Sequence, residues 1–261
     1  LDTYQVLAKL WYCAELHMRR TILKENFPIP SLSEMASLMA QKPKASFPLI
    51  DFYSQILRCH QQGGPTRAEL ILLISQFKQH LNLMVKNQQK NVFRHLTNWT
   101  YQLKEQENEV SKNQILFDLY HYANEQQLLL QGGRMTDRPL NNITVMACLL
   151  KKFVWVEKFI KDYQSSLPPK MRANATTLSK TYLYFHQKKF DLAIVELQGV
   201  QFINPAYMLR GRTLYIRSLY ESLERKPENY AVLVADIKSF KRLLYRYRKA
   251  IISKEKFEQY L

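Results

Sequence analysis

Apolar residues recur at spacings of three and four along almost the whole chain, which is the pattern of helices with one buried face. Tyr4, Leu7, Ala8 and Trp11 begin the first such run. The spacing predicts helices near residues 3–24, 31–41, 48–62, 66–84, 88–106, 111–131, 139–150, 153–166, 171–187, 190–202, 206–224 and 229–251, with a short one at 253–260. No segment alternates apolar and polar residues for long enough to predict a strand, so the expected fold class is all-α.

Residues at the ends of these segments are typical of helix caps. Three pairs have the spacing of a capping box, in which two side chains accept bonds from free backbone N–H groups: Thr66 with Glu69, Ser31 with Glu34, and Ser111 with Gln114. Gly63 and Gly132 follow periodic runs at the place where a helix ends in a left-handed residue. The connections are short, so sequential helices are expected to be antiparallel neighbours.

The second half of the chain contains an internal repeat with an offset of 37 residues. Lys151-Lys152-Phe153 recurs as Lys188-Lys189-Phe190, and Pro168 recurs as Pro205. Three pairs of apolar positions align at the same offset: Val156 with Ala193, Ile160 with Leu197, and Tyr163 with Val200. A looser third copy follows 40 residues later, with Tyr230, Leu233, Ile237 and Phe240 at the corresponding positions. We expect Pro205 to end the helix before it, because proline lacks an N–H and clashes with the preceding turn.

Two sets of five residues share one spacing of 9, 4, 3 and 5 residues: Tyr184, Ala193, Leu197, Val200 and Pro205, and Ala147, Val156, Ile160, Tyr163 and Pro168. This spacing resembles the tetratricopeptide repeat (TPR), although Thr177, Thr181 and the period of 37 depart from the family pattern. The resemblance covers residues 137–250 and implies a TPR-like α-solenoid of antiparallel helix pairs, whose groove receives a peptide or a helix of another protein.

The same region is similar to an uncharacterised bacterial family of helical-repeat proteins. The landmark residues are Val154-Trp155-x-Glu157-Lys158-Phe159-Ile160, and this resemblance implies no activity. One helix pair cannot bury both of its faces, so stacked units with a continuous core fit the repeat. The alternative is a compact helical bundle without repeats.

We expect one continuous solenoid domain with three parts. N-terminal helices occupy residues 1–46, long helical pairs occupy 47–136, and TPR-like repeats with a C-terminal capping helix occupy 137–261. Helical spacing begins with the first residues, and the chain starts with Leu1 instead of Met. The N-terminal helices are therefore expected to continue a longer parent chain.

Charge is distributed unevenly along the chain. Its 261 residues include 38 Lys and Arg against 22 Asp and Glu, a net charge of +16. Residues 1–130 hold 14 basic and 11 acidic residues, and residues 131–261 hold 24 and 11, so the net charges are +3 and +13. A basic C-terminal half favours an anionic partner. The alternative is charge that only keeps the helix surfaces soluble.

The last long helix concentrates this charge on one side. A helical wheel places six apolar residues on one arc: Phe240, Leu243, Leu244, Tyr247, Ala250 and Ile251. Six cations lie opposite: Lys238, Lys241, Arg242, Arg246, Arg248 and Lys249. This number exceeds what a helix C-terminus requires, because the dipole effect fades within one turn. We predict that this face binds an anionic partner; the alternative is a solvated face that caps the end of the solenoid.

Motifs of catalytic or metal chemistry are weak in this sequence. The Gly63-Gly64 and Gly132-Gly133 pairs lack the strand and the lysine of a phosphate-binding loop. Asp118, His121 and Glu125 share one helix face, but no other histidine has the carboxylate three residues earlier that a second metal-binding helix would supply. We expect an exposed ion pair there and no metal. Cys13, Cys59 and Cys148 lie among apolar neighbours and are predicted to be buried, inert thiols.

The resemblance to tetratricopeptide repeats implies a non-enzymatic protein-binding scaffold that uses a helical-repeat groove, and we expect no cofactor. The expected partner is a protein or peptide, including an acidic one. The alternative function is binding of nucleic acid, RNA in particular, by the basic C-terminal half. No apolar run approaches the ~18 residues of a membrane span, and the expected location is the cytoplasm.

Overall fold

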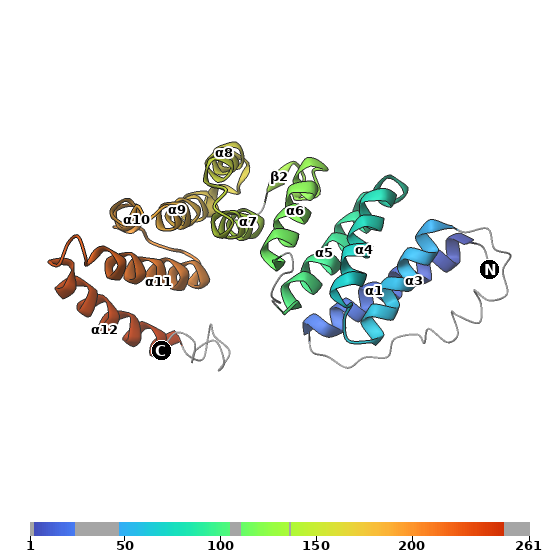
Figure 1. Cartoon of the computed structure of the whole chain (residues 1–261), viewed down its shortest axis with the longest axis horizontal. Helices are drawn as coiled ribbons and strands as arrows, with labels where there is room; N and C mark the ends of the chain where they lie inside the picture. The colour runs from blue at the N-terminus through green and yellow to red at the C-terminus, as the bar shows by residue number, and fades with distance from the viewer. Residues whose placement is uncertain (1–2, 24–46, 105–110, 136, 248–261) are drawn as a thin grey trace. The chain divides into compact units, whose positions relative to one another are not determined.

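The computed structural model describes residues 3–23, 47–104, 111–135 and 137–247, and these are almost entirely helical (Figure 1). The predicted all-α class is confirmed. Within these ranges, none of the helices combines the length and the apolar character that a membrane crossing needs. The chain divides into two compact units, Leu1–Leu128 and Leu129–Leu261. The helices predicted at 31–41 and 253–260, with the Ser31–Glu34 capping pair, lie outside the described residues.

Each helix of the described chain begins within two residues of its predicted start. Unit 1 contains α1 (Thr3–Leu23), α3 (Pro48–Gln61), α4 (Arg67–His80), the 3-10 turn Leu81–Leu83, α5 (Lys86–Gln102) and α6 (Lys112–Glu125). Unit 2 contains β1 (Leu130–Gln131), β2 (Arg134–Met135), α7 (Asp137–Leu149), α8 (Phe153–Tyr163), the 3-10 turn Gln164–Ser166, α9 (Pro169–His186), α10 (Phe190–Leu197), α11 (Pro205–Ser222) and α12 (Asn229–Tyr247).

The apolar faces of the unit 1 helices meet in a shared core. Helix α1 packs on α3 and α5, α3 packs on α4, and α5 packs on α4 and α6. Phe52, Tyr53, Phe77, Leu96 and Leu116 are among the side chains that are at most 1% exposed. Each of these helices therefore buries the stripe that its periodicity predicts.

Helix caps in unit 1 follow the sequence pattern closely. The Thr66 hydroxyl accepts from Glu69 N, and the Glu69 carboxylate accepts from Thr66 N at 2.8 Å, so this capping box is confirmed. At Ser111 the predicted box is only half formed in the described residues: Gln114 N donates to the Ser111 hydroxyl, and the Gln114 side chain turns to Asp118, to which its amide donates. Gly63 has a φ of +82° just after α3, as predicted for a left-handed helix end.

The predicted helix 111–131 is six residues too long. Helix α6 ends at Glu125, Gln127 adopts a φ of 56°, and the chain then forms the two-stranded hairpin β1–β2. Gly132 and Gly133 are the central residues of its turn, with φ of 56° and 74°. Such two-residue turns need positive φ at both positions, which glycine adopts at little steric cost. Gly132 is therefore a hairpin residue and does not cap a helix.

In unit 2, successive helices pack on each other, and α9 also packs on α7 and α11. Helix α7 contacts α8 and α9, helix α9 contacts α8, α10 and α11, and helix α11 contacts α10 and α12. Figure 1 shows this progression from α7 to α12. Helix α9 is thus covered by its two sequence neighbours and by the first helices of the adjoining pairs.

Two helix ends in unit 2 are built in the same way, 37 residues apart. Lys151 and Lys188 are both left-handed, with φ of 56° and 60°. Lys152 N donates to Ala147 O, and Lys189 N donates to Tyr184 O, each at 2.9 Å. These bonds, which satisfy the last free carbonyls of a helix, turn the chain directly into α8 and α10.

The aligned apolar positions of the first two copies are equivalent in the structure. Val156 and Ala193 are both fully buried, and Ile160 and Leu197 are 4% and 9% exposed. The third copy agrees only in part: Leu233 and Phe240 are buried, but Tyr230 is 64% and Ile237 is 37% exposed. Among the described elements α12 packs mainly on α11, so fewer of its positions are covered.

The role predicted for Pro205 is wrong. Helix α10 already ends at Leu197, followed by Gly199 with a φ of +73°, and Pro205 is the first residue of α11. Pro168 likewise caps the start of α9. Proline is suited to this place because its fixed φ fits a helix and its missing N–H would have had no helical partner.

A buried polar cluster connects three helices of unit 2. The Asn141 amide on α7 donates to the Tyr207 hydroxyl on α11, and the Ser179 hydroxyl on α9 donates to Asn141 Oδ1, both at 2.9 Å. Asn141 and Ser179 are fully buried. A displaced helix would leave these groups without partners, at a cost of about 1–3 kcal/mol for each group. The cluster therefore favours one alignment of α7, α9 and α11.

The buried Ala193 gives a test of the pairing. Leucine at this position would overpack α10 and should lower the free energy of unfolding by about 1–3 kcal/mol, measured by urea unfolding with far-UV circular dichroism. Val195 lies on the same helix and is 63% exposed, so Val195→Leu should change this energy by less than about 0.5 kcal/mol. Equal effects of the two changes would contradict the packing described for α10.

Candidate functional site

The predicted two-sided character of the last helix is present over the described part of α12. Phe240 and Leu244 are 7% and 0% exposed and form a core cluster with Leu209 of α11. The cations Lys238, Lys241, Arg242 and Arg246 are all exposed. Arg248 and Lys249 lie outside the described residues. We call the four described cations the α12 basic face.

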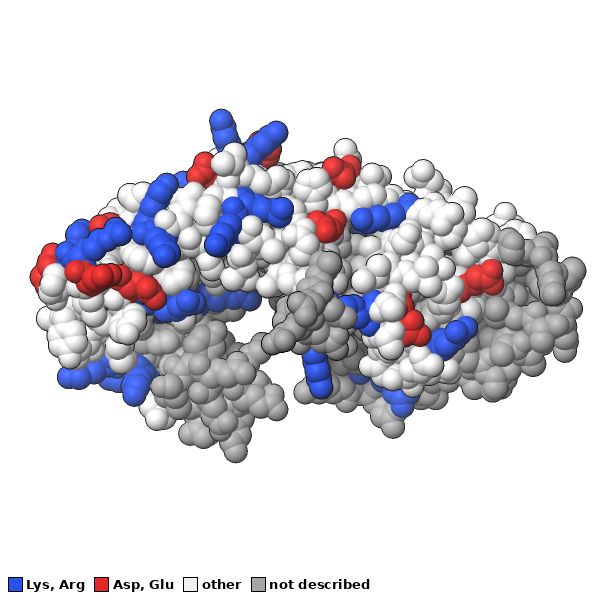
Figure 2. Space-filling model, viewed as in Figure 1, with Lys and Arg blue, Asp and Glu red and all other residues white. Residues whose placement is uncertain are grey.

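The α12 basic face carries little neutralising charge. Asp236, the acidic residue of α12, is paired with Arg212 of α11 at 2.7 Å. Within the described ranges, none of the four cations forms an ion pair. Lys238, Arg242 and Arg246 follow one another at four-residue steps, which a helix converts to steps of about 6 Å along its axis. More widely, Figure 2 shows more basic than acidic side chains over the region of α8 to α12.

The three residues weighed as a metal site do not converge. His121 Nδ1 lies 3.5 Å from Glu125 Oε1, and both side chains are substantially exposed. Asp118 instead accepts a bond of 2.7 Å from the Gln114 amide. No group of three or more His, Cys, Asp or Glu residues in the described chain has the geometry to hold a metal ion.

The cysteines are buried, as predicted. Burial raises the pKa of Cys13, and raises that of Cys59 to about 11 and that of Cys148 to about 12. Since the thiolate is the reactive form of cysteine, these groups are poor nucleophiles near neutral pH.

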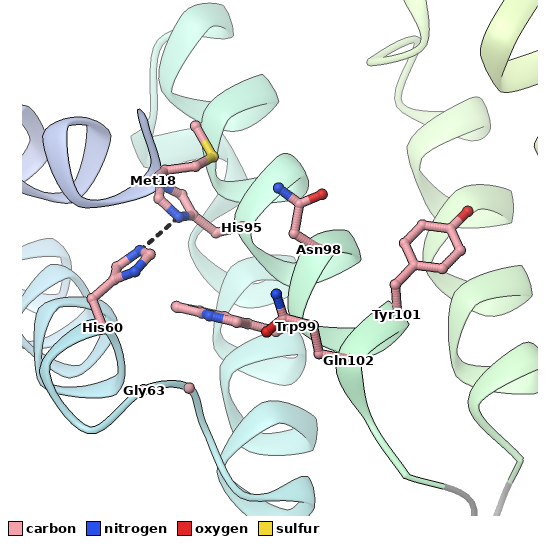
Figure 3. Close-up of a pocket in the computed structure, with 9 residues that line it drawn as sticks. Met18, His60, Gly63, His95, Asn98, Trp99, Tyr101 and Gln102 are labelled. Carbon is pink, nitrogen blue, oxygen red and sulfur yellow. Dashed lines mark hydrogen bonds between the residues drawn. The ribbon is translucent and has the colours of Figure 1, made fainter. Parts of the chain in front are cut away.

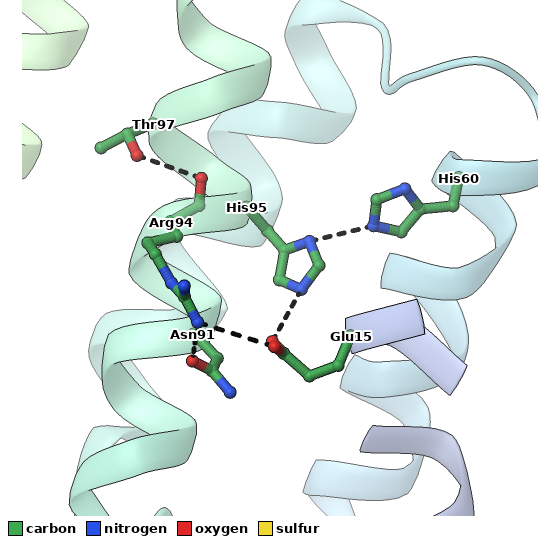
Figure 4. A network of polar contacts seen from close by, with 6 residues as sticks. All are labelled: Glu15, His60, Asn91, Arg94, His95 and Thr97. Atoms are coloured by element: carbon green, nitrogen blue, oxygen red, sulfur yellow. Dashed lines mark hydrogen bonds and ion pairs between the residues drawn. The ribbon is translucent and has the colours of Figure 1, made fainter. Parts of the chain in front are cut away.

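Unit 1 contains a polar network that the sequence analysis does not anticipate (Figure 4). Glu15 of α1 lies with its Oε1 3.6 Å from Nε2 of His95 on α5. His95 Nδ1 lies 2.9 Å from Nε2 of His60 on α3. Three helices thus contribute one carboxylate and two imidazoles to a single chain of contacts. Arg94 also approaches the Glu15 carboxylate, at 3.6 Å, and hydrogen-bonds Asn91.

The sequence of contacts from Glu15 to His95 to His60 indicates which ring nitrogen of each histidine carries the proton. The Glu15 carboxylate favours a proton on the facing Nε2 of His95, which leaves Nδ1 of a neutral His95 as an acceptor. His60 must then donate its Nε2 proton to His95, so the lone pair of His60 is on Nδ1. Within the described part of the chain, that Nδ1 has no hydrogen-bond partner.

Burial keeps the imidazole rings of His60 and His95 neutral. It lowers the pKa of His60 to about 3, and the nearby His95 and His17 add to this effect. The pKa of His95 is also lowered by burial, which outweighs the opposing effect of Glu15. His17 stacks on His60 with ring centroids 5.5 Å apart. Four charged or titratable groups lie around His60 and His95: Glu15, His17, Arg20 and Arg94.

His60 and His95 also form part of the wall of a pocket in unit 1. The pocket has a volume of about 590 Å³ and is lined by Met18, His60, Gly63, Gly64, His95, Asn98, Trp99, Tyr101 and Gln102. Figure 3 shows Trp99 beside the two imidazoles; its ring centroid is 4.9 Å from that of His60 and 5.7 Å from that of His95.

This site could not be found from local spacing. His60 and His95 are 35 residues apart, and Glu15 precedes His60 by 45 residues on another helix. A histidine with a carboxylate three residues earlier is a pattern within one helix, whereas these three side chains come from three helices. The available signal is the position of His95 between Val92, Leu96 and Trp99, since a polar residue on an apolar helix face often has a buried partner.

Acidification should destabilise unit 1 through His60. The pKa of His60 is lower in the folded chain, so the unfolded chain binds a proton there more strongly. The contribution of neutral His60 to the free energy of unfolding is therefore fully present above the unfolded pKa of about 6.5. It is lost progressively as the pH falls toward 3. Between pH 7 and pH 5 this group alone should lower the free energy of unfolding by about 2 kcal/mol. His60→Gln has no imidazole to protonate and should show a correspondingly smaller loss.

Unit 1 can be followed selectively in a Trp155→Phe background, because Trp11 and Trp99 then report on that unit alone. Urea unfolding by tryptophan fluorescence at the two pH values gives the energies. His121→Gln, on an exposed face of α6, is the matched control. An equal pH effect in the wild type and in His60→Gln would show that burial does not keep His60 neutral.

Comparison of the chain with protein-family models, with curated proteins and with solved structures found no match. The resemblance of residues 137–250 to tetratricopeptide repeats therefore stays a prediction.

Proposed function

We propose that this chain is a non-enzymatic scaffold that binds an acidic segment of another protein through a TPR-like helical repeat. In this proposal α7, α9 and α11 are the first helices of three repeat units, and α8, α10 and α12 are the second helices. The identical helix ends at Lys151 and Lys188 and the matching burial of Val156 and Ala193 support it. So does the contact of each first helix with the next, since stacked pairs bury a continuous core.

One cleft between the unit 2 helices offers cations to an acidic ligand. It has a volume of about 380 Å³, lies between α8 and α9, and includes Lys161 and Lys180 together with one acidic residue, Glu157, in its lining. In a second cleft, of about 470 Å³ between α10, α11 and α12, the lining residue Arg212 is already paired with Asp236. In contacts with the carboxylates of a partner, arginine adds paired hydrogen bonds and lysine adds a point charge.

The single observation that carries the proposal is the α12 basic face. Its helix is fixed by buried Phe240 and Leu244, while four cations are exposed on the other side without acidic partners in the described chain. A partner helix with carboxylates at four-residue steps has the same ~6 Å spacing as Lys238, Arg242 and Arg246. Complementary charge of this kind raises association rates and selects among partners.

Nucleic acid is less well matched to this surface. Binding of single strands without sequence preference uses several aromatic platforms along a basic groove. Among the described side chains around Lys241 to Arg246, one is an exposed aromatic: Tyr245, which is 58% exposed. We therefore favour a protein partner, and we assign no catalytic residue in this chain.

The proposal predicts the effect of reversing the charge of the α12 basic face. A Lys238→Glu, Arg242→Glu, Arg246→Glu variant should bind a fluorescein-labelled acidic helical peptide at least about fivefold more weakly, with a shallower salt dependence, in an anisotropy titration. Its melting temperature should be nearly unchanged, because exposed charges contribute little to stability.

A matched variant, Lys158→Glu, Lys170→Glu, Lys189→Glu, makes the same charge change at three other exposed positions of unit 2. It should bind the peptide nearly as well as the wild type. Equal weakening in both variants would mean that the peptide is attracted by net charge alone. Unchanged binding in the α12 variant would mean that α12 only caps the end of the helical repeat. A single-stranded RNA that binds more tightly than the peptide would replace the protein partner with nucleic acid.

A further inference from the structure

We propose that the pocket between α1, α3 and α5 binds a flat, uncharged nitrogen heterocycle, whose ring N–H donates to Nδ1 of His60. The pocket lies entirely within unit 1 and is separate from the surface assigned to the protein partner. The inference is thus independent of the proposed scaffold function. It rests on the order of the buried polar contacts, one ion-pair contact and one hydrogen bond, and on the side chains that line the pocket.

The first step is the free acceptor on His60. Glu15 at one end of the chain fixes the proton of His95 on Nε2, and His95 in turn takes the Nε2 proton of His60. His95 is 2% exposed, so water does not compete for its bonds. His60 lines the pocket, and its remaining ring nitrogen is left as an acceptor. A ligand that matches it must supply an N–H or O–H donor.

The second step is the aromatic wall. Trp99 is 6% exposed and lies against both imidazoles. Met18 adds a buried thioether to the same lining. Flat ring systems gain from contact with such surfaces through offset stacking and sulfur–aromatic contact. The wall therefore selects for a planar ligand.

The third step is the pair of amides on α5. Asn98 and Gln102 are one helical turn apart, so they are on the same face of the helix. Neither amide has a hydrogen-bond partner within the described residues. An amide offers a donor and an acceptor side by side, which suits the edge of a nitrogen heterocycle.

The fourth step is charge. Among the described residues that line the pocket there is no Lys, Arg, Asp or Glu, and the two histidines there are neutral. A charged ligand would lose hydration there without gaining an oppositely charged partner from these residues, which disfavours its binding. The volume of about 590 Å³ is within the usual range for small-molecule pockets, roughly 300–1,000 Å³.

The test compares two probes that differ at one position. Theophylline carries a ring N–H where caffeine carries an N-methyl group, and both are flat and uncharged at pH 7. Ligand-observed saturation-transfer NMR on the full chain should show that theophylline binds at least fivefold more tightly than caffeine. Benzoate, which is flat but anionic, should show no binding. Absence of theophylline binding, or equal binding of the three probes, would overturn the proposal.

Variants show whether His60 is the acceptor. His60→Phe keeps a flat ring of similar size but has no ring nitrogen, so the preference for theophylline should fall to about onefold. His121→Phe, outside the pocket, should leave the preference unchanged. Asn98→Ala, at a half-buried position, should weaken binding of theophylline about threefold and provides a second readout if His60→Phe unfolds. A preference that persists in folded His60→Phe, or binding unchanged by Asn98→Ala, would contradict the assignment.

Discussion

The arrangement of unit 2 depends on how the chain reverses at the ends of α7 and α9. At both ends a lysine adopts the left-handed conformation, which costs a residue with a side chain roughly 1–2 kcal/mol. The hydrogen bonds to Ala147 O and Tyr184 O, and the burial of the helices that follow, offset that cost. Because each reversal takes only a few residues, the next helix must pack directly on the one before it. The close approach explains why Val156 and Ala193 are fully buried at equivalent positions.

Buried polar groups then select one packing among those that the apolar stripes allow. In unit 2, Asn141 bonds both Tyr207 and Ser179, so the relative positions of three helices are coupled. In unit 1, the Glu15–His95–His60 chain has the same effect on α1, α3 and α5. Apolar contacts tolerate small shifts because they have no direction, whereas a buried hydrogen bond lost to such a shift is not replaced by water. These clusters thus add specificity to cores whose stability comes mainly from apolar burial.

Solvent exposure gives the two units different electrostatic properties. In unit 1, burial keeps His60 and His95 neutral and converts them into directional hydrogen-bonding groups. In unit 2, the cations of α12 remain in water and act through charge at longer range. The first environment suits a small, uncharged ligand held by specific bonds, and the second suits an extended acidic partner attracted before contact.

The sequence by itself determined the helices, most of their starts and the two faces of α12, because periodicity and caps depend on residues within one or two turns. Thr66 with Glu69 forms its predicted capping box for that reason. Only the tertiary structure decided where Pro205 belongs, that residues 130–135 form a hairpin, and that Ile237 is exposed. The same holds for the contact of Glu15, His95 and His60, which come from three helices. Their meeting depends on how those helices pack, and packing is a property of the whole unit that no local spacing records.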